Sequence, residues 1–153
     1  MLEPEAIEAY RHLLLPLAEL ITPNLHEVRL LSGCAIEGAA DVERAAAMLL
    51  DLGPGAVLIK GGGLVQLRGR DYLLERNGGG QWLEHAPVET PHTHGSGCTL
   101  GAAITAERAK GRELLEAVTS AKTFVHNGLR EGLAIGSGQG PLCHWHPLLS
   151  SHG

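Results

Sequence analysis

One short segment near the middle of the chain restricts the fold most. Residues 56–60 read Ala-Val-Leu-Ile-Lys, and three glycines follow them directly. A continuous apolar run of this length, between a helical pattern and a glycine cluster, predicts a buried strand of a parallel sheet. Since helices cover both faces of such a sheet, the segment indicates an α/β protein.

Helical patterns on both sides of this strand agree with that class. Apolar spacing, caps and glycine stops predict helices over residues 4–20, 25–31, 42–52, 98–110 and 113–131, with Asp41 as the cap of the third. Residues 20–22 predict a second short strand, and residues 71–76 and 81–85 around an Asn-Gly turn predict a β-hairpin. Two central strands are few for a parallel sheet, so we expect the chain to be part of a larger fold or to pair its open edge with another subunit.

Composition excludes several classes of protein. The 153 residues fit one ordinary domain, and the net charge of −5 argues against a general nucleic-acid binder. No apolar run approaches the roughly 18 residues that a membrane span needs. With 44% hydrophobic residues but only two Trp, two Tyr and one Phe, the core is expected to be aliphatic.

The cysteines and the N-terminus predict a cytoplasmic location. The first ten residues lack the basic start and the apolar stretch of a secretory signal. Three cysteines, at positions 34, 98 and 143, cannot all pair within the chain. We therefore expect free thiols in a reducing compartment.

The strongest chemical signal is a glycine loop that opens directly into a helix at residues 94–100, His-Gly-Ser-Gly-Cys-Thr-Leu. Unpaired N–H groups and the helix dipole place partial positive charge at a helix start, and glycines let that backbone approach a ligand. The motif therefore predicts a phosphate cradle. A thiol at a helix start ionises more readily, which makes Cys98 a candidate proton acceptor. An ordinary loop with a buried cysteine is the alternative.

Two further signals come after the predicted strands. Asn24 and Glu27 lie three residues apart, on the same side of a helical turn, and their oxygens suit Mg²⁺, often through water. Taken alone, the pair fits an N-cap with a solvated carboxylate better. Lys60 ends a buried strand, where ligand sites of α/β sheets gather, so it is either a phosphate contact or a solvated strand end.

Other reactive patterns rank lower. Two groups offer zinc ligands, His92-x-His94-x3-Cys98 and Cys143-His144-x-His146, but the paired CxxC spacing of structural zinc sites is absent. A nucleophilic group of Cys98 with either histidine and an acid ranks below phosphate transfer, because the glycines around Cys98 suit an anion. No GxxxxGK[ST] sequence occurs, which excludes a P-loop.

Three motifs in this order resemble the bacterial hydroxymethylpyrimidine/phosphomethylpyrimidine kinases of thiamine biosynthesis, in the ribokinase-like superfamily. They are Ile21-Thr22-Pro23-Asn24-x-x-Glu27, Val57-Leu58-Ile59-Lys60-Gly61-Gly62 and Thr93-His94-Gly95-Ser96-Gly97-Cys98-Thr99-Leu100. The pair Ala121-Lys122 and the ending Gly140-Pro141-x-Cys143-His144-x-His146 also resemble that family. The cysteine of the third motif is specific, since most ribokinase-like enzymes have Asp there.

The resemblance implies a ribokinase-like α/β/α sandwich with a mostly parallel sheet and a β-hairpin. Family members are far longer, so residues 1–153 are expected to form the C-terminal, ATP-binding and phosphoryl-transfer half of the domain. The N-terminal half would carry most residues that grip the pyrimidine. The resemblance implies ATP and Mg²⁺ as cofactors and a small pyrimidine as substrate. It implies neither nucleic acid nor membrane as a partner, and it favours a homo-oligomer or pairing with the missing N-terminal half.

The resemblance also implies roles for single residues. Gly95, Ser96 and Gly97 would form the anion hole for the transferring phosphoryl group, and Cys98 would be the catalytic base. The ATP-binding residues would be Asn24, Glu27, Lys60 and Thr99, with Asn24 and Glu27 also placing Mg²⁺ through water.

Two alternative functions stay open. A pyridoxine/pyridoxal kinase shares these loops, although the ending of the chain leans toward the pyrimidine enzyme. A nucleotide-binding remnant or an assembly subunit would bind ATP without turnover. We also expect that residues 1–153 alone do not phosphorylate the pyrimidine efficiently.

Overall fold

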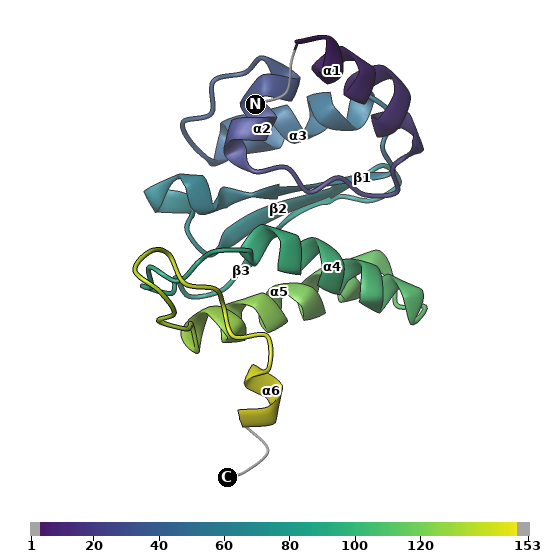
Figure 1. The fold of residues 1–153 in the computed structure, drawn as a ribbon. Helices are drawn as coiled ribbons and strands as arrows, with labels where there is room; N and C mark the ends of the chain where they lie inside the picture. The colour runs from purple at the N-terminus through teal and green to yellow at the C-terminus, as the bar shows by residue number, and fades with distance from the viewer. Residues whose placement is uncertain (1–3, 150–153) are drawn as a thin grey trace. The chain divides into compact units, whose positions relative to one another are not determined.

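The computed structural model describes residues 4–149, and the chain forms two compact units, residues 1–84 (unit 1) and 85–153 (unit 2). Unit 1 contains the sheet and the first helices, and unit 2 is helical (Figure 1). The elements of unit 1 are α1 (Pro4–Ala9), η1 (Tyr10–Leu14), η2 (Leu15–Leu17), α2 (Leu25–Ser32), α3 (Ala39–Asp51), β1 (Ala56–Lys60), η3 (Gly61–Gly63), η4 (Val65–Leu67), β2 (Arg70–Glu75) and β3 (Gly80–Glu84). Those of unit 2 are α4 (Ser96–Ala109), α5 (Leu114–Arg130) and α6 (His146–Leu149).

The sheet of unit 1 has the order β1-β2-β3, and both strand pairs are antiparallel. Parallel pairing occurs at the other edge of β1, where residues 21–24 form the bridges Ile21–Val57 and Asn24–Lys60. The sheet is therefore less parallel than expected, because the hairpin supplies two of its three strands. The predicted hairpin is confirmed, with bounds shifted by one residue at each end.

The central position of β1 explains its sequence. Its first four residues are at most 1% exposed, and its neighbours are β2 on one edge and residues 21–24 on the other. A strand with partners on both edges and packed faces has no place for a polar side chain before its end. Lys60 is the first residue of β1 that reaches solvent in part.

The predicted first helix is shorter than expected. α1 ends at Ala9, and the chain continues through a π-helical turn and a 3-10 turn that ends at Leu17. Pro16 lies in this last turn. Because proline lacks a backbone N–H and its ring collides with the preceding turn, a regular helix does not continue through this position to residue 20.

The prediction that Asp41 caps the third helix is wrong. The cap of α3 is Gly38, and Asp41 lies inside the first turn. Its carboxylate accepts a hydrogen bond from the backbone N–H of Glu37 at 2.9 Å and pairs with Arg44 at 2.6 Å. These contacts, the Glu37 backbone bond first, hold the pKa of Asp41 below its ordinary value. An acidic residue in the first turn also suits the helix dipole.

The aliphatic core predicted from composition is confirmed in unit 1. Tyr72 is the one aromatic member of the buried cluster. Its ring packs on Trp82 across the hairpin, with ring centroids 5.1 Å apart. The other members are Leu15, Ile21, Leu25, Val28, Ile36, Val42, Ala45, Ala46, Leu49, Val57, Ile59 and Leu67.

In unit 2, α4 and α5 pack against each other, and their bounds agree with the predicted helices to within two residues. Gly111, at φ +85°, follows the end of α4. The three cysteines are free thiols, as expected. Between residues 4 and 149, no helix combines the length and the apolar character that crossing a membrane requires.

The glycines after β1 provide a matched test of packing. A Cβ at Gly61 would overlap the carbonyl oxygen of Arg70 and lie 2.8 Å from that of Leu67, whereas a Cβ at Gly62 meets nothing within 4 Å. We expect Gly61→Ala to lower the free energy of unfolding by about 2 kcal/mol. Gly62→Ala should change it by less than about 0.5 kcal/mol. Urea unfolding followed by circular dichroism measures both, and equal effects would contradict the packing described.

Candidate functional site

The predicted glycine loop forms the start of α4. Gly95 is the residue that caps the helix, and its φ of +79° lies in the left-handed region that favours glycine. A Cβ at this position would meet nothing within 4 Å, so the requirement for glycine is conformational. The turn at Gly95 directs the first N–H groups of α4 outward from the helix end.

Two N–H groups within the first turn of α4 are open. The amide of Ser96 donates to the carbonyl of Thr93 at 3.2 Å, and that of Thr99 donates to Gly95 at 2.8 Å. Within residues 4–149, the amides of Gly97 and Cys98 have no hydrogen-bond acceptor. An anion at this helix end would therefore meet these two donors and the positive end of the helix dipole. The amide of Ser96 was expected to be part of the anion hole, but it donates its hydrogen bond within the loop.

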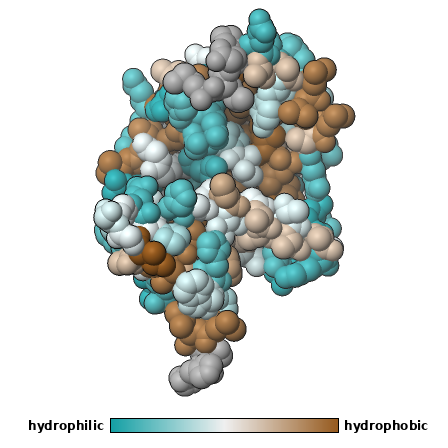
Figure 2. Space-filling model, in the orientation of Figure 1, coloured by the Kyte–Doolittle hydropathy of each residue, from teal (hydrophilic) through white to brown (hydrophobic). Residues whose placement is uncertain are grey.

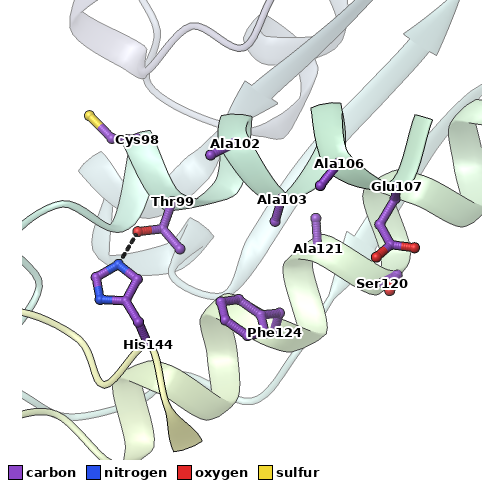
Figure 3. A pocket seen from close by; sticks show the side chains of 10 residues that line it. All are labelled: Cys98, Thr99, Ala102, Ala103, Ala106, Glu107, Ser120, Ala121, Phe124 and His144. Carbon is purple, nitrogen blue, oxygen red and sulfur yellow. Dashed lines mark hydrogen bonds between the residues drawn. The ribbon is translucent and has the colours of Figure 1, made fainter. Parts of the chain in front are cut away.

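A pocket of about 540 Å³ opens beside this helix start (Figure 3). Its walls are mainly small apolar side chains on the facing sides of α4 and α5, and the ring of Phe124 lines it from α5. Sequence reasoning missed this pocket, because it depends on which faces of two helices meet. The lining residues are Cys98, Thr99, Ala102, Ala103, Ala106, Glu107, Ser120, Ala121, Phe124 and His144.

Three reactive side chains lie at the cradle end of the pocket. The hydroxyl of Thr99 is 2.9 Å from Nε2 of His144, and the two form a hydrogen bond. The thiol of Cys98 is exposed and points away from this pair (Figure 3). His144 was expected only as a low-ranking zinc ligand, and the C-terminal motif to which it belongs was the one available signal for its place here.

Glu107 lies at the opposite end of the pocket and is neutralised by two cations. Its carboxylate pairs with Lys110 at 2.7 Å and with Arg112 at 2.9 Å. The hydrogen bond from Lys110 is the main reason that the pKa of Glu107 lies below its ordinary value. This carboxylate is thus an ionised structural partner of two basic residues and is engaged away from the cradle.

In unit 1, Asn24 and Glu27 form a capping box at the start of α2. The side chain of Asn24 accepts from the backbone N–H of Glu27 at 3.0 Å, and the Glu27 carboxylate accepts from the N–H of Asn24 at 2.7 Å. The cap, weighed above as the alternative to a metal site, is thus present. Asn24 also bridges to Lys60, so the structure brings these two predicted residues to neighbouring positions.

The oxygens of this capping box fit a hydrated magnesium ion. Both residues are exposed, and the capping bond engages one carboxylate oxygen of Glu27. Mg²⁺ keeps several waters and takes one or two protein carboxylates, so a single exposed carboxylate is compatible with it. Among residues 4–149 no group of three or more His, Cys, Asp or Glu side chains gathers in a way that could hold a metal ion.

His92 and His94 take part in contacts with the chain's last segment. Nδ1 of His92 accepts from the backbone N–H of Gly140 at 3.2 Å, and the N–H of His94 donates to the carbonyl of Gly140 at 3.2 Å. The ring of His92 is therefore engaged with residue 140. This contact gives no support to the alternative in which His92 activates Cys98.

Gly95 at the cap of α4 and Gly101 inside the helix provide a second matched pair. Gly95→Ala should lower the free energy of unfolding by about 1 kcal/mol, because alanine is strained at positive φ. Gly101 lies inside α4 with open space around it. Gly101→Ala should raise the free energy of unfolding by about 0.5 kcal/mol, since alanine favours helix. Thermal and urea unfolding measure the difference, and a stabilising Gly95→Ala would contradict the left-handed cap.

Comparison with known proteins identifies clear relatives. The family model for phosphomethylpyrimidine kinase matches residues 1–143. A hydroxymethylpyrimidine/phosphomethylpyrimidine kinase from Synechococcus elongatus is 49% identical over 152 residues, which is 97% of this chain and 56% of the relative. The chain thus spans a little over half the length of the curated relatives it matches.

Solved structures agree with the sequence relatives. The ADP complex of a Bacillus subtilis pyridoxal kinase matches with a TM-score of 0.91 at 38% identity, covering 97% of this chain and 58% of that protein. A phosphomethylpyrimidine kinase from Clostridium difficile matches with a TM-score of 0.67 at 36% identity, covering 82% of this chain and 50% of that protein. These matches confirm the ribokinase-like α/β fold.

Proposed function

Because the chain belongs to the phosphomethylpyrimidine kinase family, we propose that it acts in ATP-dependent phosphorylation of a pyrimidine alcohol. The substrates would be 4-amino-5-hydroxymethyl-2-methylpyrimidine and its monophosphate, in thiamine diphosphate biosynthesis. The observation that carries this proposal is the pair of open amides, on Gly97 and Cys98, at the start of α4.

The proposed reaction is an in-line transfer of the terminal phosphoryl group. The attacking atom is the hydroxyl oxygen of the alcohol or, for the monophosphate, an oxygen of its phosphate group. It attacks the γ-phosphorus, the bond to the β-phosphate oxygen breaks, and ADP leaves. The open amides stabilise the negative charge on the transferring group, which is the main source of catalysis in such reactions. Cys98 takes the hydroxyl proton. Its exposed thiol at the helix start supports this assignment.

The remaining predicted residues are assigned to the nucleotide. Lys60 would contact the phosphate chain, and its partial exposure at the end of β1 supports this. Asn24 and Glu27 would hold hydrated Mg²⁺, which when bound neutralises charge on the phosphates. Thr99 would contact ATP from the first turn of α4. The apolar walls of the pocket suit a planar base, because they present few polar groups.

A pyridoxal kinase is the second candidate, and a specific observation favours it. The Bacillus subtilis structure that matches over 97% of this chain is a pyridoxal kinase. The sequence relatives that match at 40–49% identity favour the pyrimidine. Both substrates present a hydroxymethyl group on an aromatic nitrogen ring, so the same transfer step serves either. A direct competition between the two alcohols decides between them.

We propose further that residues 1–153 are the C-terminal half of a kinase domain and that the rest of the domain pairs with unit 1. The support is an open sheet edge at residues 21–24. Ile21 and Pro23 use their backbone groups toward β1, whereas, within residues 4–149, the N–H and carbonyl of Thr22 have no partner. Alternate groups of a strand point to opposite edges, so Thr22 offers its groups to another strand.

Exposed leucines of unit 1 support the same pairing. Leu13, Leu14 and Leu17 are 67%, 57% and 84% exposed, shortly before the open edge in sequence. Figure 2 shows apolar surface over the segment that follows α1. An apolar cluster of this kind marks an interaction surface. We propose that the other half of the domain occupies this surface, because the part of the relatives that this chain does not match is about as long as the part that it matches.

The free thiols are consistent with a cytoplasmic location.

Loss of the Cys98 thiol tests the catalytic assignment. Purified chain is mixed with the non-matching part of the Synechococcus elongatus relative, Mg-ATP and either alcohol, and ADP release is measured. We expect turnover only in the mixture, and Cys98→Ala should lower it at least about 100-fold. Affinity for Mg-ATP should stay within about threefold, because the backbone donors remain.

Cys34→Ala is the matched control and should leave turnover unchanged, since this thiol lies in unit 1 against Met48. Full activity of Cys98→Ala would remove Cys98 as the proton acceptor. Robust turnover by the chain without its added half would refute the need for pairing. ATP binding with no turnover on either alcohol would favour the non-catalytic remnant.

Substitution of an exposed leucine tests the pairing surface. Leu17→Asp should weaken association with the added half at least about tenfold, because a charge on an apolar contact must be desolvated. Val65→Asp is the control, since Val65 is 74% exposed elsewhere in unit 1. Sedimentation velocity measures both. If Leu17→Asp and Val65→Asp associate equally well, or if the chain pairs only with itself, the proposed surface is wrong.

A further inference from the structure

A segment near the end of the described residues, around Gly140 and Pro141, contacts the glycine loop that precedes α4 in unit 2. His94, immediately before Gly95, forms a parallel bridge with Pro141, and its N–H donates to Gly140 at 3.2 Å. The N–H of Leu133 donates to the carbonyl of Pro141 at 3.0 Å. Residues 140 and 141 therefore lie beside the loop that precedes α4, although the sequence separates them by more than forty residues.

Close packing fixes the position of this segment. Leu142 and Cys143 are fully buried, and the N–H of Cys143 donates to Gly128 of α5 at 2.9 Å. A Cβ at Gly128 would lie 2.8 Å from a methyl carbon of Leu142, and a Cβ at Gly140 would overlap the carbonyl oxygen of Leu133. There is little free space for the segment to move, so the residue that follows Cys143 has a defined place.

That residue, His144, reaches back to the first turn of α4. Its Nε2 lies 2.9 Å from the hydroxyl of Thr99, whose side chain lines the same pocket (Figure 3). Thr99 is only 9% exposed, and its backbone N–H is already bonded to Gly95. A threonine hydroxyl has one hydrogen to donate and two lone pairs that accept. The histidine therefore determines in which direction that hydrogen points.

We propose that His144 is a positioning residue for the anion cradle and acts through Thr99. When Nε2 carries a hydrogen, it donates to the Thr99 oxygen, and the hydroxyl hydrogen of Thr99 is then free to bond a phosphate oxygen. Thr99 thereby adds a third donor to the open amides of Gly97 and Cys98. This role rests on the proposed nucleotide function of the cradle, and it gives the C-terminal segment a part in phosphate binding.

A double-mutant cycle tests this role in the full chain, with Mg-AMP-PCP as the probe and calorimetry as the measurement. Thr99→Val removes the hydroxyl, and His144→Phe removes the ring nitrogens but keeps a ring. Each should weaken binding about tenfold, the usual size for a hydrogen bond to a charged group. The double variant should bind no more weakly than Thr99→Val alone, because both changes remove one interaction.

Two further variants separate positioning from folding. His144→Gln places an amide donor near the Nε2 position and should restore affinity to within about threefold of wild type. His12→Phe, at an exposed histidine of unit 1, should leave affinity unchanged. If the losses of affinity of the two single variants multiply in the double variant, or if His144→Phe binds as wild type does, the proposed role of His144 is wrong. Either result would leave the proposed phosphate binding by the amides of Gly97 and Cys98 unaffected. If the wild-type chain itself does not bind Mg-AMP-PCP, the proposed nucleotide function fails, and this role fails with it.

Discussion

The start of α4 is the constraint on which the chemistry of unit 2 depends. A helix leaves its first N–H groups without intrahelical acceptors, and most helices satisfy them with a side-chain cap. Here the capping residue is Gly95, which has no side chain to supply, and its left-handed conformation ends the loop abruptly. The amides of Gly97 and Cys98 thus have no acceptor among residues 4–149, while α4 as a whole packs on α5.

Unit 1 satisfies the corresponding groups in the opposite way. The capping box of Asn24 and Glu27 engages the helix start of α2 at the place where parallel pairing with β1 ends. Asn24 therefore ends the strand segment, caps the helix and forms a backbone bridge with Lys60. Among the described residues of unit 1, Thr22 at the strand edge has an N–H and a carbonyl without a partner. The start of α4 therefore offers backbone N–H donors, the start of α2 offers side-chain oxygens, and the edge at Thr22 offers backbone groups for strand pairing.

Sequence patterns predicted the features that depend on neighbouring residues. The apolar run of β1, the Asn-Gly hairpin and the glycine loop before Cys98 each contain their physical cause within a few positions, and the structure has all three. The end of the first helix, near Pro16, was predicted wrongly. The cap of α3 was also predicted wrongly, because Gly38 and Asp41 both satisfy simple capping preferences and local geometry chooses between them. The pocket and the bond from His144 to Thr99 join residues far apart in the chain, and no local pattern encodes such an approach.

The walls of the pocket have a consequence for how this protein family can change its ligands. Ala102, Ala103, Ala106 and Ala121 leave space because their side chains end at Cβ. Interiors are packed densely enough that each added carbon is felt, so a larger side chain at any of these four sites would change the depth of the cavity. A single nucleotide change in a codon can exchange alanine for valine or glycine and so reshape the cavity while the backbone donors of the adjoining loop keep their geometry. In the proposed site, ring selectivity and phosphate handling are therefore separable during evolution.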